Sequence, residues 1–188
     1  MVTSLDKKTA LVLIDLQKGI VQFPVIHPIK EILAKAAALV SAFRKAGLPV
    51  VIVHVDPTKS LLNNRRTDAN AKFSSFPDEW FEITPEIETT EEDIFITKHA
   101  WNAFTNPSLD IELKKRDITG IVLAGVSTSV GVEGTARAAS ELGYNITFAQ
   151  DATTDTNADA FEHSVKRIFP RLGEVDDTDR IIAALADL

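Results

Sequence analysis

Five short apolar runs recur along the chain, and each is followed by a charged residue, an amide or a glycine. Their residues are mostly aliphatic or β-branched, and apolar and polar positions do not alternate. Such runs are typical of strands that are covered on both faces, as in a parallel sheet. The pattern therefore predicts strands over residues 9–14, 50–55, 94–97, 121–124 and 145–149.

The segments between these runs have helical features. Residues 30–46 are rich in Ala and Leu, carry a Glu31–Lys35 pair one turn apart, and stop at Gly47. Further helices are predicted over residues 107–116, 132–142 and 157–168, with a short one from Thr178. Strands and helices that alternate in this way imply a doubly wound α/β fold with right-handed crossovers. We take residues 1–188 to form one domain, because this length is ordinary for a single core.

One long stretch, residues 57–93, interrupts the alternation between the second and third strands. Connections of this length are usually functional, so we predict a lid or a binding loop. The alternative is a surface excursion with a small core of its own. The stretch contains two arginines and four aromatic residues, namely Arg65, Arg66, Phe73, Phe76, Trp80 and Phe81.

Charge and composition narrow the class of partner. The chain has 27 acidic and 20 basic residues, which gives a net charge of −7. An acidic chain lacks bulk attraction to nucleic acid or to an anionic membrane. No apolar run approaches membrane-spanning length, and the first residues contain no apolar signal core. We therefore expect a cytoplasmic protein that acts on a small molecule, with neither nucleic acid nor membrane as a partner.

The chain contains no cysteine. This excludes disulfides, thiolate metal sites and every cysteine nucleophile. The four histidines show no metal-ligand spacing, so we expect neither a catalytic metal nor a cofactor. His54 falls inside a predicted strand, where packing is the simpler role, and His99 is a candidate for the edge of a site.

Polar residues follow the predicted strands at their carboxyl ends, where open α/β sheets bind ligands. Asp15 and Lys98 are opposite charges in such positions, although each alone is most simply a turn aspartate or a solvated lysine. On strands that we expect to be adjacent they would form a buried pair, and such pairs cluster at active sites. Lys98 would lower the pKa of Asp15 and burial would raise it, so acid and base roles both stay open. The other candidates are Gln17, Asp56, His99, residues 125–131 and Asp151.

Residues 125–131, Gly-Val-Ser-Thr-Ser-Val-Gly, connect the fourth strand to a helix. Small residues let backbone N–H groups approach a ligand, and a helix N-terminus favours negative charge, so this turn is a candidate cradle for a carboxylate or an oxyanion. A tight turn without any ligand explains the same composition. The glycine spacing does not match a dinucleotide or phosphate-binding loop.

Three ordered motifs resemble those of the isochorismatase-like hydrolases, and the resemblance extends over residues 8–175. It implies a three-layer α/β/α fold, with a mainly parallel sheet of about six strands, and a homodimer or homotetramer formed near the Gly131 helix. The motifs are Ala10-Leu-Val-Leu-Ile-Asp15-Leu-Gln17, then Thr97-Lys98-His99-Ala100-Trp101-Asn102-Ala103-Phe104, and finally the segment from Gly125 through Arg137 to Asp151-Ala152.

Most members of that family have a cysteine nucleophile where this chain has Gly131. The resemblance therefore implies a site reduced to Asp15 and Lys98, and it implies no metal, because Pro57-Thr58 follows Asp56 where metal-binding members have Asp-x-His. True isochorismatases also have glycine there, and they hydrolyse a vinyl ether without a covalent intermediate.

By similarity to the true isochorismatases, Asp15 is the general acid and Lys98 holds the substrate. The turn at Val126–Ser127, which the family often makes through a cis peptide, binds a carboxylate. True isochorismatases carry glutamine at the position of Asp56, which is a departure in this chain. The implied substrate contacts are Gln17, Asp56, Trp101, Val126, Ser127 and Thr128.

Two other functions remain open from the sequence. An amide or ester hydrolase without cysteine would need another nucleophile, and the nearest hydroxyls belong to Ser127, Thr128 and Ser129. A ligand-binding protein that has lost catalysis would need neither a nucleophile nor an acid.

Overall fold

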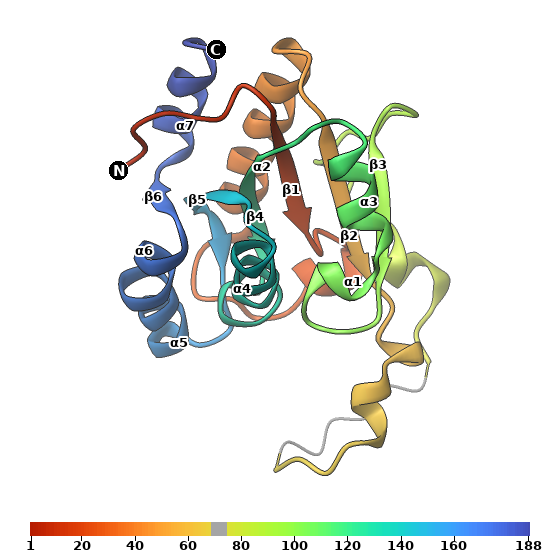
Figure 1. Ribbon diagram of the computed structural model, residues 1–188. Coiled ribbons are helices and arrows are strands. Elements are labelled where there is room, and N and C mark those ends of the chain that lie inside the picture. Colours follow the sequence, from red (N-terminus) through yellow and green to blue (C-terminus); the bar gives the residue numbers. More distant parts are fainter. Residues whose placement is uncertain (69–74) are drawn as a thin grey trace.

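Six parallel strands form one sheet in the computed structural model, which describes residues 1–68 and 75–188. The sheet order is β3-β2-β1-β4-β5-β6, and every neighbouring pair is parallel (Figure 1). This order confirms the doubly wound α/β fold, and the winding direction reverses between β1 and β4. The strands are β1 (Thr9–Ile14), β2 (Val50–Val55), β3 (Ile94–Lys98), β4 (Gly120–Val126), β5 (Asn145–Thr154) and β6 (Glu174–Asp176).

Helices cover both faces of the sheet and complete three layers (Figure 1). On one face pack α3 (Ser108–Lys114), α4 (Glu133–Glu141) and α6 (Phe169–Leu172). On the other pack α2 (Ile29–Lys45) and α7 (Thr178–Leu185). The remaining helices are α1 (Lys18–Val21) and α5 (Ala158–His163). Within the two described ranges, no helix has both the length and the apolarity needed to cross a membrane.

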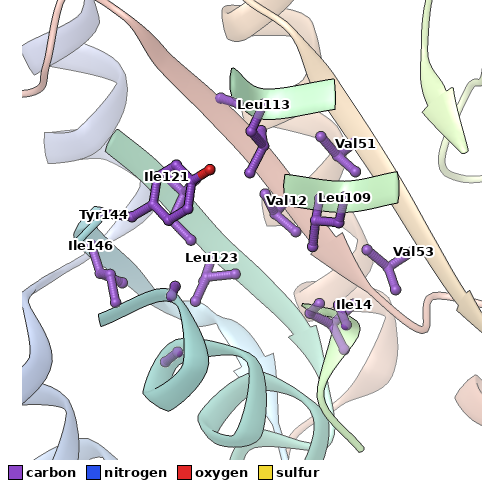
Figure 2. Packing of buried hydrophobic residues seen from close by; sticks show 14 of the residues in the cluster. Val12, Ile14, Val51, Val53, Leu109, Leu113, Ile121, Leu123, Tyr144 and Ile146 are labelled. Atoms are coloured by element: carbon purple, nitrogen blue, oxygen red, sulfur yellow. The ribbon is translucent and has the colours of Figure 1, made fainter. Parts of the chain in front are cut away.

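Strand β1 shows why its sequence lacks alternation. Val12 and Ile14 face α3 and α4, as Figure 2 shows for the α3 side, whereas Leu11 and Leu13 face α2. All four side chains are buried. Because helices cover both faces, apolar residues are favoured at every position along the strand.

The fourth and fifth strands are longer than predicted. The β4–β5 register shifts between Leu123 and Gly125, and β5 then continues to Thr154. The shift moves polar residues such as Asp151 into the strand, which is why the apolar pattern stops early. Strand β6 has three residues and is too short to give a pattern of its own.

Within its described residues, the long stretch between β2 and β3 contains three short 3₁₀ turns, at Pro57–Lys59, Leu61–Asn64 and Asp78–Phe81. Its first part projects away from the sheet (Figure 1), and Arg65 and Arg66 are exposed there. Phe76 stacks on Trp80 with ring centroids 4.3 Å apart, and Trp80 contacts Phe81 at 5.1 Å. Phe73, the fourth aromatic residue of this stretch, lies outside the described residues. The lid or binding role stays a prediction.

Gly125 provides a test of how β4 approaches β1. Its φ is +124°, and a β-carbon there would lie 2.1 Å from the Ile14 carbonyl oxygen. Gly143 is the matched control, because its φ is +88° but nothing lies within 4 Å of the added carbon. We expect Gly143→Ala to lower the free energy of unfolding by about 1 kcal/mol. Gly125→Ala should lower it by about 3 kcal/mol or more. Urea unfolding measures both, and equal losses would contradict the close approach.

Candidate active site

Asp15 lies at the carboxyl end of β1, at the point where the winding of the sheet reverses. Its backbone is left-handed, with φ of 52°, and its N–H donates to the Val53 carbonyl at 2.9 Å. The turn directs the carboxyl into the protein, where the residue is only 5% exposed. Ligands of open α/β sheets bind at such reversal points, so this is the expected location of an active site.

Lys98 ends β3, and its Nζ lies 2.7 Å from Oδ2 of Asp15. The prediction that the two residues lie on adjacent strands was wrong, because β2 lies between β1 and β3. The lysine is long enough to span this extra strand. Its Nζ also donates to the Ala100 carbonyl at 3.1 Å, and Lys98 is 2% exposed. The ion pair is thus almost completely removed from water.

Burial dominates the protonation of Asp15. It raises the pKa of the carboxyl from 3.8 to about 6, although the charge of Lys98 and its hydrogen bond both act to lower the pKa. Oδ2 is engaged by Lys98, whereas Oδ1 is buried and has no hydrogen-bond partner among the residues that the structure describes. A buried carboxyl with one unpaired oxygen and a pKa near neutrality is suited to proton transfer.

The turn after β4 forms the second wall of the site. The Val126–Ser127 peptide is cis, as the family resemblance implies, and a π-helical turn at Thr128–Val132 then leads into α4. The Thr128 hydroxyl pairs with the Thr153 hydroxyl at 2.8 Å, and Thr153 in turn donates to the Gly125 carbonyl at 2.7 Å. These bonds hold the shape of the turn.

Asp155 is a buried residue of the site region that sequence reasoning missed. Its Oδ2 accepts hydrogen bonds from the N–H of Ser129 at 2.7 Å and from its hydroxyl at 2.8 Å. Asp151 was the candidate instead, but it lies within β5 and accepts from the N–H and hydroxyl of Thr178. The sequence did carry a signal for Asp155, because this second aspartate follows Asp151 by four residues and precedes Asn157, which caps α5.

Gly131 faces the carboxyl of Asp15. A β-carbon built on Gly131 would lie 3.4 Å from Oδ2 of Asp15 and 3.6 Å from the Val126 carbonyl oxygen. The position that the resemblance assigns to a nucleophile is therefore next to the acid and beside the cis peptide. In this chain no side chain extends from it.

The other predicted contact residues have different environments. Gln17 is fully buried, and its amide pairs with both backbone groups of Val55, accepting from the N–H at 2.6 Å and donating to the carbonyl at 3.1 Å. Gln17 thus ties the end of β1 to β2. Trp101 is 61% exposed, and its backbone lies beside Gly134 of α4.

Asp56 caps the 3₁₀ turn that follows β2. Its Oδ1 accepts from the N–H and the hydroxyl of Thr58, and Lys59 lies 3.3 Å from Oδ2. Burial acts to raise the pKa of Asp56, but the hydrogen bonds from Thr58 and Lys59 outweigh it and lower the pKa. Asp56 therefore stays ionised and held by its own turn.

Two histidines, His54 and His99, lie at the carboxyl ends of β2 and β3. His54 is half-buried and bonds the Thr97 hydroxyl at 2.7 Å, and burial lowers its pKa. His99 bonds the backbone carbonyl of Asp56 at 3.0 Å. Within residues 1–68 and 75–188, no three His, Asp or Glu side chains are grouped so as to hold a metal ion.

The returning part of the long stretch is attached directly after Asp15. The N–H of Thr84 donates to the Leu16 carbonyl, and the N–H of Lys18 donates to the Glu82 carbonyl. These two hydrogen bonds flank a short antiparallel bridge between Gln17 and Ile83. The Trp80 ring lies over Gly19, so that a β-carbon there would be 2.1 Å from the indole. Trp80 is therefore packed on α1, which begins three residues after Asp15.

The fold and this buried acid–lysine pair define a doubly wound α/β protein with a candidate active site at its reversal point. A model of the isochorismatase domain matches residues 9–180. The chain belongs to the isochorismatase family, and it is a hydrolase of that family, as the motifs predict.

Individual proteins show the same relationship. The isochorismatase family protein YecD of Escherichia coli O157:H7 is 38% identical over 186 residues, which cover 95% of this chain and 97% of YecD. Nicotinamidase 3 of Arabidopsis thaliana is 26% identical over 185 residues, which cover 96% of this chain and 90% of that protein. The structure of an isochorismatase family protein from Burkholderia thailandensis matches with a TM-score of 0.92 and 38% identity, over 97% of this chain and 98% of that one.

The raised pKa of Asp15 makes stability depend on pH in a defined direction. The folded protein holds the proton up to about pH 6, whereas the unfolded chain releases it near 3.8. The stabilisation from this group is therefore complete below about pH 4 and is lost as the pH rises to about 6. Relative to Asp15→Asn, the wild-type free energy of unfolding should fall across this window. Urea unfolding at a series of pH values measures it, and a constant or rising difference would contradict the shift.

Proposed function

We propose that the protein hydrolyses a small carboxylated metabolite of the vinyl-ether type without forming a covalent intermediate. The single observation that carries this proposal is the state of Asp15. Its carboxyl is buried, its pKa is raised to about 6, and Oδ1 has no partner within the described residues. A proton donor is what the hydrolysis of a vinyl ether requires first, because this bond is broken after protonation of carbon.

The reaction runs as follows. Asp15 transfers its proton to the enol-ether carbon, and the electron pair of the double bond forms the new C–H bond. Water adds to the resulting oxocarbenium ion, releases a proton to the Asp15 carboxylate and gives a hemiketal. The hemiketal collapses to a ketone, such as pyruvate, and an alcohol. The acid is thus regenerated and no group of the protein is acylated.

Lys98 has two roles in this proposal. Its ammonium group, 2.7 Å from Oδ2, orients the carboxyl and stabilises the carboxylate that remains after proton transfer. It also brings positive charge to the place where an anionic substrate would bind. We assign the substrate carboxylate to the turn at Val126, Ser127 and Thr128, and a further contact to the exposed Trp101.

Amide hydrolysis is the runner-up, because Nicotinamidase 3 is among the relatives. The nearby hydroxyls offer little support for it. Those of Thr128 and Ser129 are bonded to Thr153 and Asp155, which hold the turn in place. Among residues 1–68 and 75–188, no histidine forms a hydrogen bond with either hydroxyl that would activate it as a nucleophile. Assembly into a homodimer or homotetramer and a cytoplasmic location stay predictions.

Pyruvate release from isochorismate, followed with a coupled assay, tests the reaction. We expect turnover by the wild-type protein, and a loss of about 10²- to 10⁴-fold in kcat for Asp15→Asn, because the amide cannot donate the required proton. The Asp56→Gln variant changes the charge of a predicted substrate contact outside the acid–lysine pair, and the loss in Asp15→Asn should exceed any change that it causes. Absence of turnover with isochorismate, together with full activity of Asp15→Asn on any accepted substrate, would overturn the proposal. Binding without turnover would favour the ligand-binding alternative.

The pH dependence separates an acid from a base. If Asp15 acts as an acid, kcat/KM should fall as the pH rises above about 6. Lys98→Met removes the charge that lowers the pKa of Asp15, so the pKa rises further. The falling limb of kcat/KM should then move to higher pH, even though the rate itself is lower. A profile that instead rises through this range would assign Asp15 as the base.

A further inference from the structure

The segment of residues 99–106, which lies between β3 and α3, is held against α4. The N–H of Ala103 donates a hydrogen bond to the Thr135 hydroxyl at 3.0 Å, and both residues are fully buried. One residue earlier on α4, a β-carbon built on Gly134 would lie 3.6 Å from Cβ of Trp101, which is an ordinary van der Waals contact. The segment is therefore packed on α4 and joined to it by a side chain of that helix.

The hydrogen bond between Ala103 and Thr135 has no replacement in water. Because both residues are fully buried, solvent cannot reach the N–H of Ala103 if the hydroxyl is removed. A buried donor that loses its acceptor keeps the full cost of its lost hydration, so the segment is expected to move until this N–H is paired again. The hydroxyl of Thr105 differs in this respect, because its hydrogen bond to the Asn102 carbonyl at 2.7 Å is exposed.

The same segment provides the second acceptor of Lys98. Its Nζ lies between Oδ2 of Asp15 at 2.7 Å and the carbonyl oxygen of Ala100 at 3.1 Å. Ala100 precedes Ala103 by three residues, so a displacement of the segment also moves this carbonyl. Lys98 is 2% exposed, which leaves little room for water to take over either contact. The position of the ammonium group relative to the acid therefore depends on where the segment is held.

The helical stretch that leads into α4 also lies beside the acid. Gly131 precedes Thr135 by four residues, which is about one helical turn, so the two positions lie on the same side of the helix. A β-carbon on Gly131 would be 3.4 Å from Oδ2 of Asp15. One end of this turn is thus next to the acid, and the other end holds the segment that provides an acceptor for Lys98.

We propose that Thr135 is a positioning residue, whose hydroxyl fixes the segment of residues 99–106 on α4 and thereby holds the ammonium group of Lys98 against Asp15. This inference deepens the proposed function and rests on it for the role of Asp15 as the acid. Thr135 itself contacts no reacting atom. It acts through the hydrogen bond to the N–H of Ala103 and, by way of the segment, through the carbonyl of Ala100.

Three substitutions separate the hydroxyl from the shape of the side chain. Thr135→Val keeps the branch at the β-carbon and replaces the hydroxyl with a methyl group. Thr135→Ser keeps the hydroxyl and removes only the methyl group, so it should retain the hydrogen bond to Ala103. Thr105→Val is the matched control, because it removes a hydroxyl from the same segment at an exposed position, where water can take its place.

Titration of the Asp15 carboxyl, followed by its ¹³C NMR signal, tests the proposal without a substrate. The signal is assigned by its absence in Asp15→Asn. We expect the same midpoint in the wild-type protein, Thr135→Ser and Thr105→Val. The midpoint of Thr135→Val should be higher by about half a pH unit or more, because the charge and hydrogen bond of Lys98 lower the pKa of Asp15 and act less strongly from further away. A merely structural role of Thr135 would lower stability and leave this midpoint in place.

An unchanged or lower midpoint in Thr135→Val would overturn the proposal, as would an equal increase in Thr135→Ser or in Thr105→Val. If Thr135→Val does not fold, Thr135→Ala removes the same hydroxyl without placing a methyl group against the N–H of Ala103, and the same criteria apply. The titration needs no turnover, so inactivity toward isochorismate is a separate outcome that bears on the proposed function alone.

Discussion

The ion pair between Asp15 and Lys98 is the interaction on which the rest of the site depends. Two charges that are almost completely removed from water lose hydration that their mutual attraction does not necessarily restore. The raised pKa of Asp15 shows that burial outweighs the lysine, so the pair is not simply a source of stability. Removal of either partner leaves the other as a buried charge. The fold must therefore bring β1 and β3 into a fixed relation, across the intervening β2.

Neighbouring polar groups hold the elements around the site in place but do not bond Oδ1 of Asp15. Gln17 uses its whole amide to join the end of β1 to β2, and Asp155 holds Ser129 at the start of the π-helical turn. Thr128 and Thr153 complete the connection between the turn and β5. These polar groups find their hydrogen-bond partners within the protein. Oδ1 of Asp15, by contrast, is buried without a partner in the described structure. A rigid surround with one unsatisfied oxygen is what preorganisation for proton transfer requires.

The sequence predicted the parts of this arrangement that follow from local pattern. Strands β1 and β2 were placed correctly, because runs covered by helices on both faces are apolar throughout. The rule that ligands bind at the carboxyl ends of strands found Asp15 and Lys98. It did not reveal that β2 separates them, because strand order is set by crossovers and not by local pattern. The extension of β5, and with it Asp155, depended on a register shift that only the packed sheet determines. Gln17 was expected to contact substrate, but its hydrogen bonds depend on the distant Val55.

The glycine at position 131 also affects the acid electrostatically. With glycine there, the protonation of Asp15 is set chiefly by two opposing effects, burial and Lys98, which together give a pKa of about 6. A thiolate on a β-carbon 3.4 Å from Oδ2 would add a second negative charge and compete for the same lysine. Acid and thiol would then titrate as a coupled pair, and the proton would be shared between them. A site that donates a proton to carbon needs this proton on the carboxyl alone. Glycine at position 131 and the raised pKa of Asp15 therefore both support the proposed reaction, in which the acid would act first and water would complete the hydrolysis.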